Sequence, residues 1–436
     1  MSSDQHEADV IVVGAGPAGS AAALVAARSG LSVILLERGP FPGSKNMYGG
    51  VVYGRILDDL VPQWYDEMPI QRWVTRRSTG VRTEDRALIV DYRTQAWGRA
   101  PYNGATTYRP DFDSWLAGKA VEAGARLVTS TTATELLLDG GRIVGVDTDR
   151  PDGRLRAPVV IACDGVNSFL AKEAGLYHHS ESSHFTLGAK ETLALPKSVI
   201  DERFGVRDLE GVDIEIIGAT QGIPGGGFVY TNLDSVAVGV VVGVDGLAEA
   251  GLRPEELIAR LKLHPAIAPL IEGAELKEYS AHIIPEGGYK KMPELATDGM
   301  MVAGDAACMT LAAGIWLEGV NFAIGSGALA GEVAVGAHAR NDFSARSLGR
   351  YRSLLEQSFV LADHRRLQDA PDLILSDRVQ RAYPALACDL AEQLFTVTNP
   401  TPKPGVRKLL QAAARSNGVK FRHVVKDGLR GLRVFG

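Results

Sequence analysis

A short apolar segment, Asp9 to Val13, runs directly into the sequence GAGPAG at residues 14–19. An alanine-rich stretch follows, and a second apolar segment, Ser32 to Leu36, ends on Glu37. Strand, glycine turn, helix and strand in this order are typical of a βαβ unit that binds a dinucleotide. The chain is therefore predicted to begin with such a unit and to hold a redox cofactor.

The spacing of the glycines has a mechanical reason. Gly14 permits a tight turn, Gly16 lets backbone N–H groups approach a pyrophosphate, and Gly19 lets the helix pack close to the strand. Glu37 lies 23 residues after Gly14, where a carboxylate accepts hydrogen bonds from an adenosine ribose. Because GxGxxG alone is a weak signal, the prediction depends on the apolar strand before it and the acid after it.

Composition and charge limit the class of protein. The chain has 436 residues and a formal net charge of −6 at pH 7, typical of a multidomain globular protein. From Lys403 onward, nine Lys or Arg residues stand against Asp427 as the one acid, so the tail is a basic patch on an acidic protein. No nucleic-acid partner is predicted.

The cysteines and the apolar stretches indicate the compartment. Cys163, Cys308 and Cys388 lie too far apart for a CxxC motif or an iron–sulfur ligand set, so no metal site is expected. Because the first residues are polar and no signal peptide is recognisable, a reducing, cytoplasmic location is predicted. The longest apolar stretch, residues 300–317, is interrupted by Asp305 and glycines, so any membrane contact is expected to be peripheral.

The pattern of apolar residues changes along the chain. Alternating strands between residues 178 and 295 predict an antiparallel sheet, and a buried strand followed by a small-residue helix then returns. The predicted fold class is α/β, a discontinuous Rossmann-type domain with an inserted antiparallel β-sheet substrate domain and a C-terminal helical, basic tail. The predicted parts are 1–75, 106–177 and 296–365 for the nucleotide domain, 76–105 and 178–295 for the substrate domain, and 366–436 for the tail. Expected strands include 126–130, 134–138, 143–148, 159–162, 212–217, 227–231 and 236–242, and expected helices include 111–124, 254–262 and 321–335.

A second candidate cofactor contact follows a late strand. Gly304 and Asp305 come after the apolar residues 300–303 and precede a glycine-rich helix start that ends at Asn321. A carboxylate there suits a polyol hydroxyl, and backbone N–H groups at the helix start suit negative charge on a reduced flavin ring. An isolated Asp in this place is more often a helix cap, so the assignment depends on the other motifs.

Together, GxGxxG, Asp164-Gly165 after a central strand and Gly304-Asp305 resemble the flavoprotein superfamily of aromatic hydroxylases, geranylgeranyl reductases and electron-transfer-flavoprotein:quinone oxidoreductases. The resemblance implies that the dinucleotide is FAD. By position, it implies that the adenosine half of FAD is bound by Gly14, Gly16, Gly19, Glu37 and Arg38. It implies that the middle of FAD is bound by Arg109 and Asp164, and the flavin half by Asp305, Gly319 and Asn321. Further implied cofactor-binding residues are Pro17, Ala18, Lys45, Asn46, Gly49, Gly50, Ala133, Gly165, Gly304, Gly314 and Val320.

Four further motifs narrow the resemblance to the FixC family, the quinone oxidoreductase subunits of FixABCX complexes. They are GSKN at 43–46 with Gly49-Gly50, GGGFVYTN at 225–232, YSAH at 279–282 with PEGG at 285–288, and KDG at 426–428. The resemblance implies that a FixAB-type electron-transfer flavoprotein, driven by NADH in electron bifurcation, delivers electrons through FAD to a membrane quinone. It also implies a FixX-type ferredoxin subunit that carries the cluster, a role in nitrogen fixation or other metabolism, and peripheral attachment to the inner face of the cytoplasmic membrane.

Several residues have two open interpretations. Phe228 and Tyr230, beside Gly227, either border the quinone or fill the core of a sheet, since they alternate on one strand. Trp316 borders the flavin or fills core, and His282 assists proton uptake or is structural. The rival activity is a geranylgeranyl or prenyl-lipid reductase, although its Tyr-x-Trp-x-Phe-Pro strand is absent, and a non-catalytic flavin-bearing scaffold is a third hypothesis.

Overall fold

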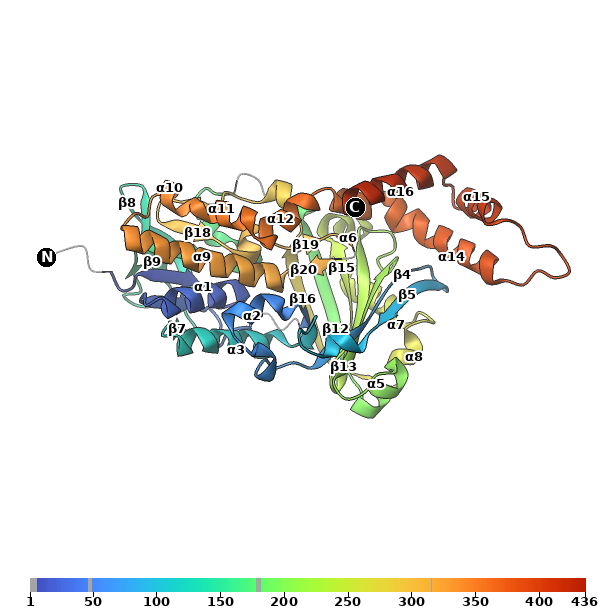
Figure 1. Cartoon of the computed structure of the whole chain (residues 1–436), viewed down its shortest axis with the longest axis horizontal. Helices are drawn as coiled ribbons and strands as arrows, with labels where there is room; N and C mark the ends of the chain where they lie inside the picture. Colours follow the sequence, from blue (N-terminus) through green and yellow to red (C-terminus); the bar gives the residue numbers. More distant parts are fainter. Residues whose placement is uncertain (1–5, 46–48, 178–181, 315) are drawn as a thin grey trace.

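The computed structural model describes residues 6–45, 49–177, 182–314 and 316–436. Figure 1 shows an elongated molecule with an α/β part at one end, a large sheet in the middle and C-terminal helices at the other end. The predicted fold class is confirmed, because a Rossmann-type sheet, a large and mostly antiparallel sheet, and terminal helices are all present. The exact domain boundaries stay predictions.

The first sheet is built around β1 (Val10–Val13), which pairs in parallel with β2 (Val33–Leu36) and β11 (Val159–Ala162). Its strand order is β17-β18-β11-β1-β2-β7, completed by β7 (Arg126–Val128), β17 (Ala296–Thr297) and β18 (Met300–Val302). All residues of the three central strands are buried, as expected where helices cover both faces of a parallel sheet. Distant chain segments therefore build one discontinuous domain.

Three helices accompany this sheet: α1 (Pro17–Arg28), α3 (Arg109–Glu122) and α9 (Val320–Arg340). Small residues let α1 and α9 approach closely, since a Cβ at Gly327 would lie 1.9 Å from the carbonyl oxygen of Ala18. Among the described helices, α9 alone is long and apolar enough to cross a membrane. However, 67% of its most apolar 18-residue stretch is buried inside the protein. This burial fits a core helix.

The second sheet has nine strands in the order β16-β12-β15-β14-β13-β4-β6-β3, with β5 paired to β4. They are β3 (Gly50–Val52), β4 (Arg72–Arg82), β5 (Ala87–Arg93), β6 (Ala105–Thr107), β12 (Phe185–Ala194), β13 (Glu210–Ile217), β14 (Gly225–Thr231), β15 (Ser235–Gly243) and β16 (Glu275–Pro285). Neighbouring strands are antiparallel except β4 and β13, which pair in parallel. The apolar pattern did not indicate this parallel pair.

Alternation along the strands gives the second sheet two different faces. Val212, Ile214 and Ile216 of β13 belong to a buried apolar core. That core also includes residues of α5 (Lys197–Phe204), α7 (Pro254–Lys262) and α8 (Ala268–Ile271). The residues between them, Asp213 and Glu215, line a cavity instead. The strand period of two therefore separates the apolar core from the polar, cavity-facing side.

Smaller elements complete the body of the protein. The predicted hairpin is present as β8 (Ala133–Asp139) and β9 (Arg142–Thr148), joined by β10 (Leu155–Arg156). The short strands β19 (Leu311–Ala312) and β20 (Leu317–Glu318) pair with each other. Further helices are α2 (Leu57–Leu60), α4 (Phe169–Glu173), α6 (Val244–Ala250), α10 (Ala345–Leu348), α11 (Arg350–Gln357), α12 (Phe359–Arg366) and α13 (Ala370–Ile374).

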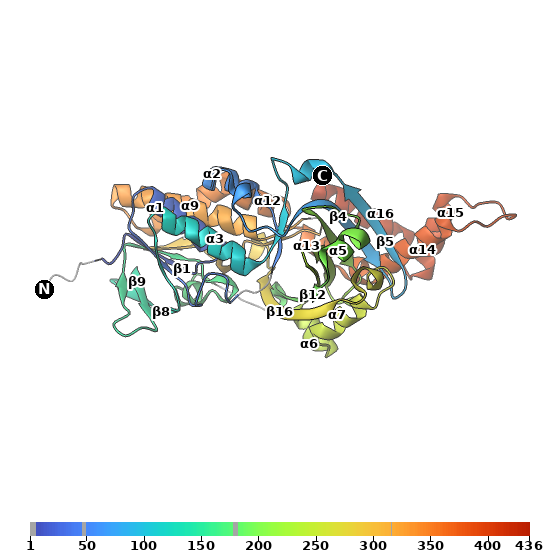
Figure 2. The same ribbon diagram turned by 90° about the horizontal axis from the view of Figure 1, so that it is seen from below.

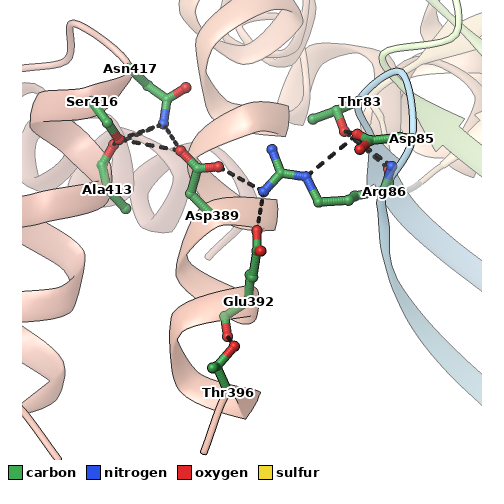
Figure 3. Close-up of polar contacts among 9 residues, drawn as sticks. All are labelled: Thr83, Asp85, Arg86, Asp389, Glu392, Thr396, Ala413, Ser416 and Asn417. Atoms are coloured by element: carbon green, nitrogen blue, oxygen red, sulfur yellow. Dashed lines mark hydrogen bonds and ion pairs between the residues drawn. The ribbon is translucent and has the colours of Figure 1, made fainter. Parts of the chain in front are cut away.

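The C-terminal arm, residues 383–436, projects from the body in both views (Figures 1 and 2). It consists of α14 (Tyr383–Phe395), α15 (Val406–Ser416) and α16 (Phe421–Phe435). In Figure 3, Arg86 from the β4–β5 turn reaches Asp389 at 2.9 Å and Glu392 at 2.5 Å, both on α14. Asp389 also accepts a hydrogen bond from Asn417 at 2.6 Å, so one cluster joins the body, α14 and the end of α15.

Candidate cofactor and substrate site

A cavity of about 710 Å³ extends from the GAGPAG turn to the polar face of the second sheet. Its wall includes the predicted residues Gly14, Gly16, Pro17, Ala18, Glu37, Arg38, Lys45, Gly49, Gly50, Arg109, Ala133, Asp164, Gly165, Asp305, Gly314, Gly319, Val320, Gly227, Phe228, Tyr230 and His282. Gly19, Gly304, Asn321 and Trp316 lie outside the wall, and Asn46 lies outside the described residues. One continuous volume therefore brings together most of the predicted cofactor residues and the predicted quinone residues.

The turn between β1 and α1 needs its glycines for different reasons. Gly14 has a φ of +98°, and a Cβ there would lie 2.3 Å from the carbonyl oxygen of Cys163. A Cβ at Gly19 would lie 1.8 Å from the carbonyl oxygen of Gly14, so the first turn of α1 packs directly on the loop. Gly16 is the N-cap of α1 and faces the cavity, where the helix N-terminus favours a phosphate.

Glu37 is held rigidly where β2 ends. Its carboxylate accepts hydrogen bonds from the backbone N–H groups of Ala15 at 3.1 Å and Gly39 at 2.7 Å. The side chain is buried but lines the cavity, and two backbone donors fix the direction of its oxygens. A fixed acceptor at this place fits the hydroxyl groups of an adenosine ribose.

A buried ion pair lies along the middle of the cavity. The Arg109 guanidinium contacts both carboxylate oxygens of Asp113, at 2.7 and 2.8 Å. Burial, the largest single cause, lowers the pKa of Arg109, but the Asp113 and Asp305 carboxylates together outweigh it and raise the Arg109 pKa overall. Arg109 therefore stays cationic, and it reaches Gly16, whose Cβ would lie 3.9 Å from Nη2.

Asp305 and His282 influence each other across the cavity. Burial raises the pKa of Asp305, while His282 and Arg109 lower it. Burial lowers the pKa of His282, Asp305 opposes this, and Arg109 and Arg38 add to the lowering. Because the net shift of the His282 pKa is downward, the imidazole is neutral at neutral pH.

The residues present fit FAD. Asp164 lines the cavity, and its Oδ1 is buried without a hydrogen-bond partner in the part of the chain that the structure describes. Its Oδ2 accepts from the backbone N–H of Leu170 at 3.1 Å, which leaves Oδ1 to accept from a bound hydroxyl group. A helix N-terminus for phosphate, fixed carboxylates for hydroxyls and a cation between them match the parts of this cofactor.

Sequence reasoning missed several titratable residues of the cavity wall, among them Tyr53, Asp113, Asp213, Glu215, Glu286 and Glu318. Asp213 and Glu215 were detectable as charged residues that alternate with apolar ones on a predicted strand. They lie directly across from Tyr230 and Phe228 on β14.

Trp316 lies outside the cavity wall, next to one of its residues. Its ring lies 6.1 Å from that of Phe435 and 5.4 Å from the guanidinium carbon of Arg366. Phe435 itself lines the cavity, so Trp316 supports the wall from behind.

Comparison with known proteins identifies the family. A family model described as FAD dependent oxidoreductase matches residues 9–213, and the ETF-QO/FixC family C-terminal domain matches residues 370–436. Protein FixC of Salmonella typhi is 40% identical over 427 residues, covering 98% of both chains. The probable electron transfer flavoprotein-quinone oxidoreductase YdiS of Escherichia coli K12 is 38% identical over 432 residues, covering 99% of both chains.

Solved structures show the same fold at lower identity. A geranylgeranyl bacteriochlorophyll reductase-like protein from Thermoplasma acidophilum aligns with a TM-score of 0.71 and 22% identity, covering 96% of this chain and 98% of the other. The flavin-dependent brominase Bmp2 aligns with a TM-score of 0.66 and 19% identity, covering 97% and 99%. The cofactor is FAD, in agreement with the family model and with the fit of the cavity. The chain belongs to the FixC family of FAD-dependent oxidoreductases.

Proposed function

We propose that this protein accepts electrons from an electron-transfer flavoprotein and reduces a quinone. The observation that carries the proposal is the continuous cavity, which joins the FAD-binding turn to the Phe228 and Tyr230 face of the second sheet. The two rings lie 5.8 Å apart with an interplanar angle of 14°, and they offer a flat apolar surface to an aromatic substrate. FAD supplies the redox chemistry there, because it takes up and releases electrons singly or in pairs.

A hydrogen bond holds the aromatic pair in position. The Tyr230 hydroxyl donates to the backbone carbonyl of Gly49 at 2.6 Å, which links β14 to the loop before β3. The relative YdiS, named a probable electron transfer flavoprotein-quinone oxidoreductase, supports the same activity. The chain's own residues thus bind and orient a quinone beside the cofactor.

The proposed donor is a FixAB-type flavoprotein that oxidises NADH and bifurcates the electrons, with a FixX-type ferredoxin subunit as the cluster carrier. Cys163, Cys308 and Cys388 are free, buried and far apart in the sequence, which supports a cluster on another chain. The test combines the purified protein, the FixAB-type and FixX-type proteins of its organism, NADH, a soluble quinone analogue and a low-potential acceptor, without oxygen.

Both acceptors are expected to be reduced together, and both reactions are expected to stop when this subunit is omitted. Reduction of a prenyl double bond with the quinone untouched would support the rival prenyl-lipid reductase instead. If the bound FAD reduces neither the quinone analogue nor a prenyl double bond, the protein would instead be a non-catalytic, flavin-bearing scaffold.

Truncation of Phe228 tests the quinone pocket. Phe228→Ala is expected to raise the KM for the quinone analogue about fivefold, since an aromatic contact contributes on the order of 1 kcal/mol. FAD content is expected to stay the same. The matched control is Tyr92→Ala, because Tyr92 is also one of an aromatic pair, with Trp97, but is 56% exposed and outside the cavity wall. Equal KM values for the two variants would remove Phe228 from the pocket.

We also propose that the C-terminal arm attaches the protein to an anionic membrane surface. Val425, Leu429 and Leu432 are exposed along one side of α16, at intervals of four and three residues. Arg422, Lys426, Arg430 and Arg433 accompany them on the same helix. An apolar stripe with basic neighbours is typical of a helix that lies in the membrane interface. Leu394, Phe395, Val397 and Val406 are exposed around the α14–α15 connection and extend the apolar surface.

Removal of two exposed leucines tests the attachment. Leu429→Ser/Leu432→Ser is expected to lower sedimentation with vesicles of phosphatidylglycerol and phosphatidylcholine at least about tenfold, from roughly 1.5 kcal/mol or more per buried leucine. Leu263→Ser is the control, since Leu263 is 79% exposed but distant from the arm in sequence. Binding that persists in the double variant would contradict the membrane role of α16.

A further inference from the structure

A buried cluster of mixed charge forms part of the substrate end of the cavity. Arg77 on β4 donates a hydrogen bond from Nη2 to Oε1 of Glu215 at 2.9 Å, and its Nε lies 3.6 Å from Oδ2 of Asp213. Both carboxylates belong to β13, and their side chains are only 6% exposed for Asp213 and 15% exposed for Glu215. One guanidinium thus faces two carboxylates that are shielded from water.

The charges of this cluster do not balance if both acids are ionised. Burial raises the pKa of Glu215, and the negative charge of Asp213 raises it further against the opposing effect of Arg77. Burial also raises the pKa of Asp213, again against Arg77. Together the pair therefore retains a proton to higher pH than isolated carboxyls.

The surrounding groups reinforce this state. The Tyr53 ring lies 5.8 Å from the guanidinium carbon of Arg77, and burial raises the Tyr53 pKa, so its hydroxyl is neutral. Glu318 on β20 also has a pKa raised by burial, with Asn321 and Arg77 opposing the rise. The titratable and charged groups that face the pair are thus Tyr53 before α2, Arg77 on β4, Tyr230 on β14 and Glu318 before α9.

The pair lies beside the proposed quinone pocket. Asp213 is the register partner of Tyr230, and Glu215 is the register partner of Phe228, so all four side chains share one face of the sheet. His282, the sequence-based candidate for proton uptake, is less suited to store a proton because its pKa is lowered.

We propose that Asp213, Glu215 and Arg77 form a proton-donating site that delivers one proton to a carbonyl oxygen of the quinone. The proposal rests on the proposed quinone reductase function. Arg77 is a positioning residue, since it orients both carboxyl groups. Glu215 is the donor, since it is the register partner of Phe228 in the proposed quinone pocket.

The proton balance of the reaction requires such a donor. Reduction of a quinone to a quinol adds two electrons and two protons. Bound FAD would supply both electrons and one of the protons. The other proton comes from Glu215: its carboxyl O–H bond breaks while an O–H bond forms on the quinone oxygen. The resulting carboxylate remains paired with Arg77 and regains a proton from water.

Infrared spectroscopy tests the shared proton without turnover. Difference spectra of the FAD-bound protein between about pH 5 and about pH 9 are expected to show a protonated-carboxyl C=O band that disappears as the pH rises. Glu215→Gln is expected to remove the band. Asp213→Asn is expected to keep it but shift its midpoint to lower pH, because a like charge has been removed. Glu210→Gln is the matched control on β13, where Glu210 pairs with Arg93 at 2.9 Å outside the cavity wall.

Kinetics then tests the delivery step. Glu215→Gln is expected to lower kcat for the quinone analogue about 100-fold, the usual scale of a general acid. Reduction of its FAD by the donor flavoprotein is expected to be unchanged, as is kcat for Glu210→Gln.

Two results would contradict the proton-donating site but leave the proposed quinone reductase function intact. One is quinone reduction by Glu215→Gln at the wild-type rate. The other is a carboxyl band that persists in Glu215→Gln and disappears in Glu286→Gln. Glu286 is the sharpest rival, since it also lines the cavity and burial raises its pKa to about 7. If the wild-type protein shows the carboxyl band but does not reduce the quinone, the proposed quinone reductase function is wrong. Proton delivery from Glu215 to the quinone is then wrong as well.

Discussion

Replacement of Gly19 by alanine is expected to destabilise the protein by about 3 kcal/mol and to yield chains that lack FAD. The new Cβ would lie 1.8 Å from the carbonyl oxygen of Gly14 and 3.2 Å from a methyl group of Val12. These atoms belong to the cofactor turn and to β1, so space for the methyl group requires α1 to move away from both. Such a movement displaces the N–H groups at Gly16 that are directed to the phosphates. The checks are the ratio of flavin to protein absorbance and the unfolding free energy in urea.

Gly118→Ala provides the control for this substitution. Gly118 lies within α3, and a Cβ there would meet no atom within 4 Å. Alanine is therefore expected to leave FAD binding unchanged and to stabilise the helix by up to about 1 kcal/mol. A Gly19→Ala protein with full flavin content and wild-type stability would show that α1 and the turn do not pack as described.

Replacement of Arg109 by leucine is expected to cost about 3 to 5 kcal/mol of stability at neutral pH, because Asp113 is left buried and uncompensated. Only 2% of the Asp113 side chain is exposed, and both of its oxygens lie within 2.8 Å of the Arg109 guanidinium. Without that cation the Asp113 pKa rises further above its unfolded value. The variant is thus least impaired near about pH 5 and loses stability as the pH rises through the folded pKa, the sign for a carboxyl with a raised pKa. Urea unfolding at several pH values measures this.

The double variant Arg109→Leu/Asp113→Leu separates structure from cofactor binding. Removal of both charges is expected to restore most of the lost stability, since no buried ion remains without a partner. FAD affinity is expected to stay low, because Arg109 is the cation beside Gly16 and the cavity. A double variant that binds FAD as tightly as the wild type would limit Arg109 to a structural role.

The features that could be predicted from the sequence are those that depend on residues close together in the chain. The GAGPAG turn, the all-buried β1 and the period-two strands β13, β14 and β15 each follow from neighbouring residues. The parallel pairing of β4 with β13 was not predictable, because it joins segments more than a hundred residues apart through the packing of the whole sheet.

The same distinction applies to the site. Alternating Asp213 and Glu215 indicated one polar face, but only the pairing of β13 with β4 and β14 brings Arg77 and Phe228 beside them. Trp316 meets Phe435 because α16 returns to the body, which no pattern near residue 316 indicates.

The position of Phe435 has a practical consequence for anyone who expresses this protein. Phe435, at the end of α16, lines the cavity. In Figure 1 the carboxyl terminus is marked beside the second sheet, although the arm extends well beyond it. An affinity tag or fluorescent fusion attached directly to the C-terminal end of α16 would place foreign polypeptide beside the cavity and would confound every kinetic comparison above.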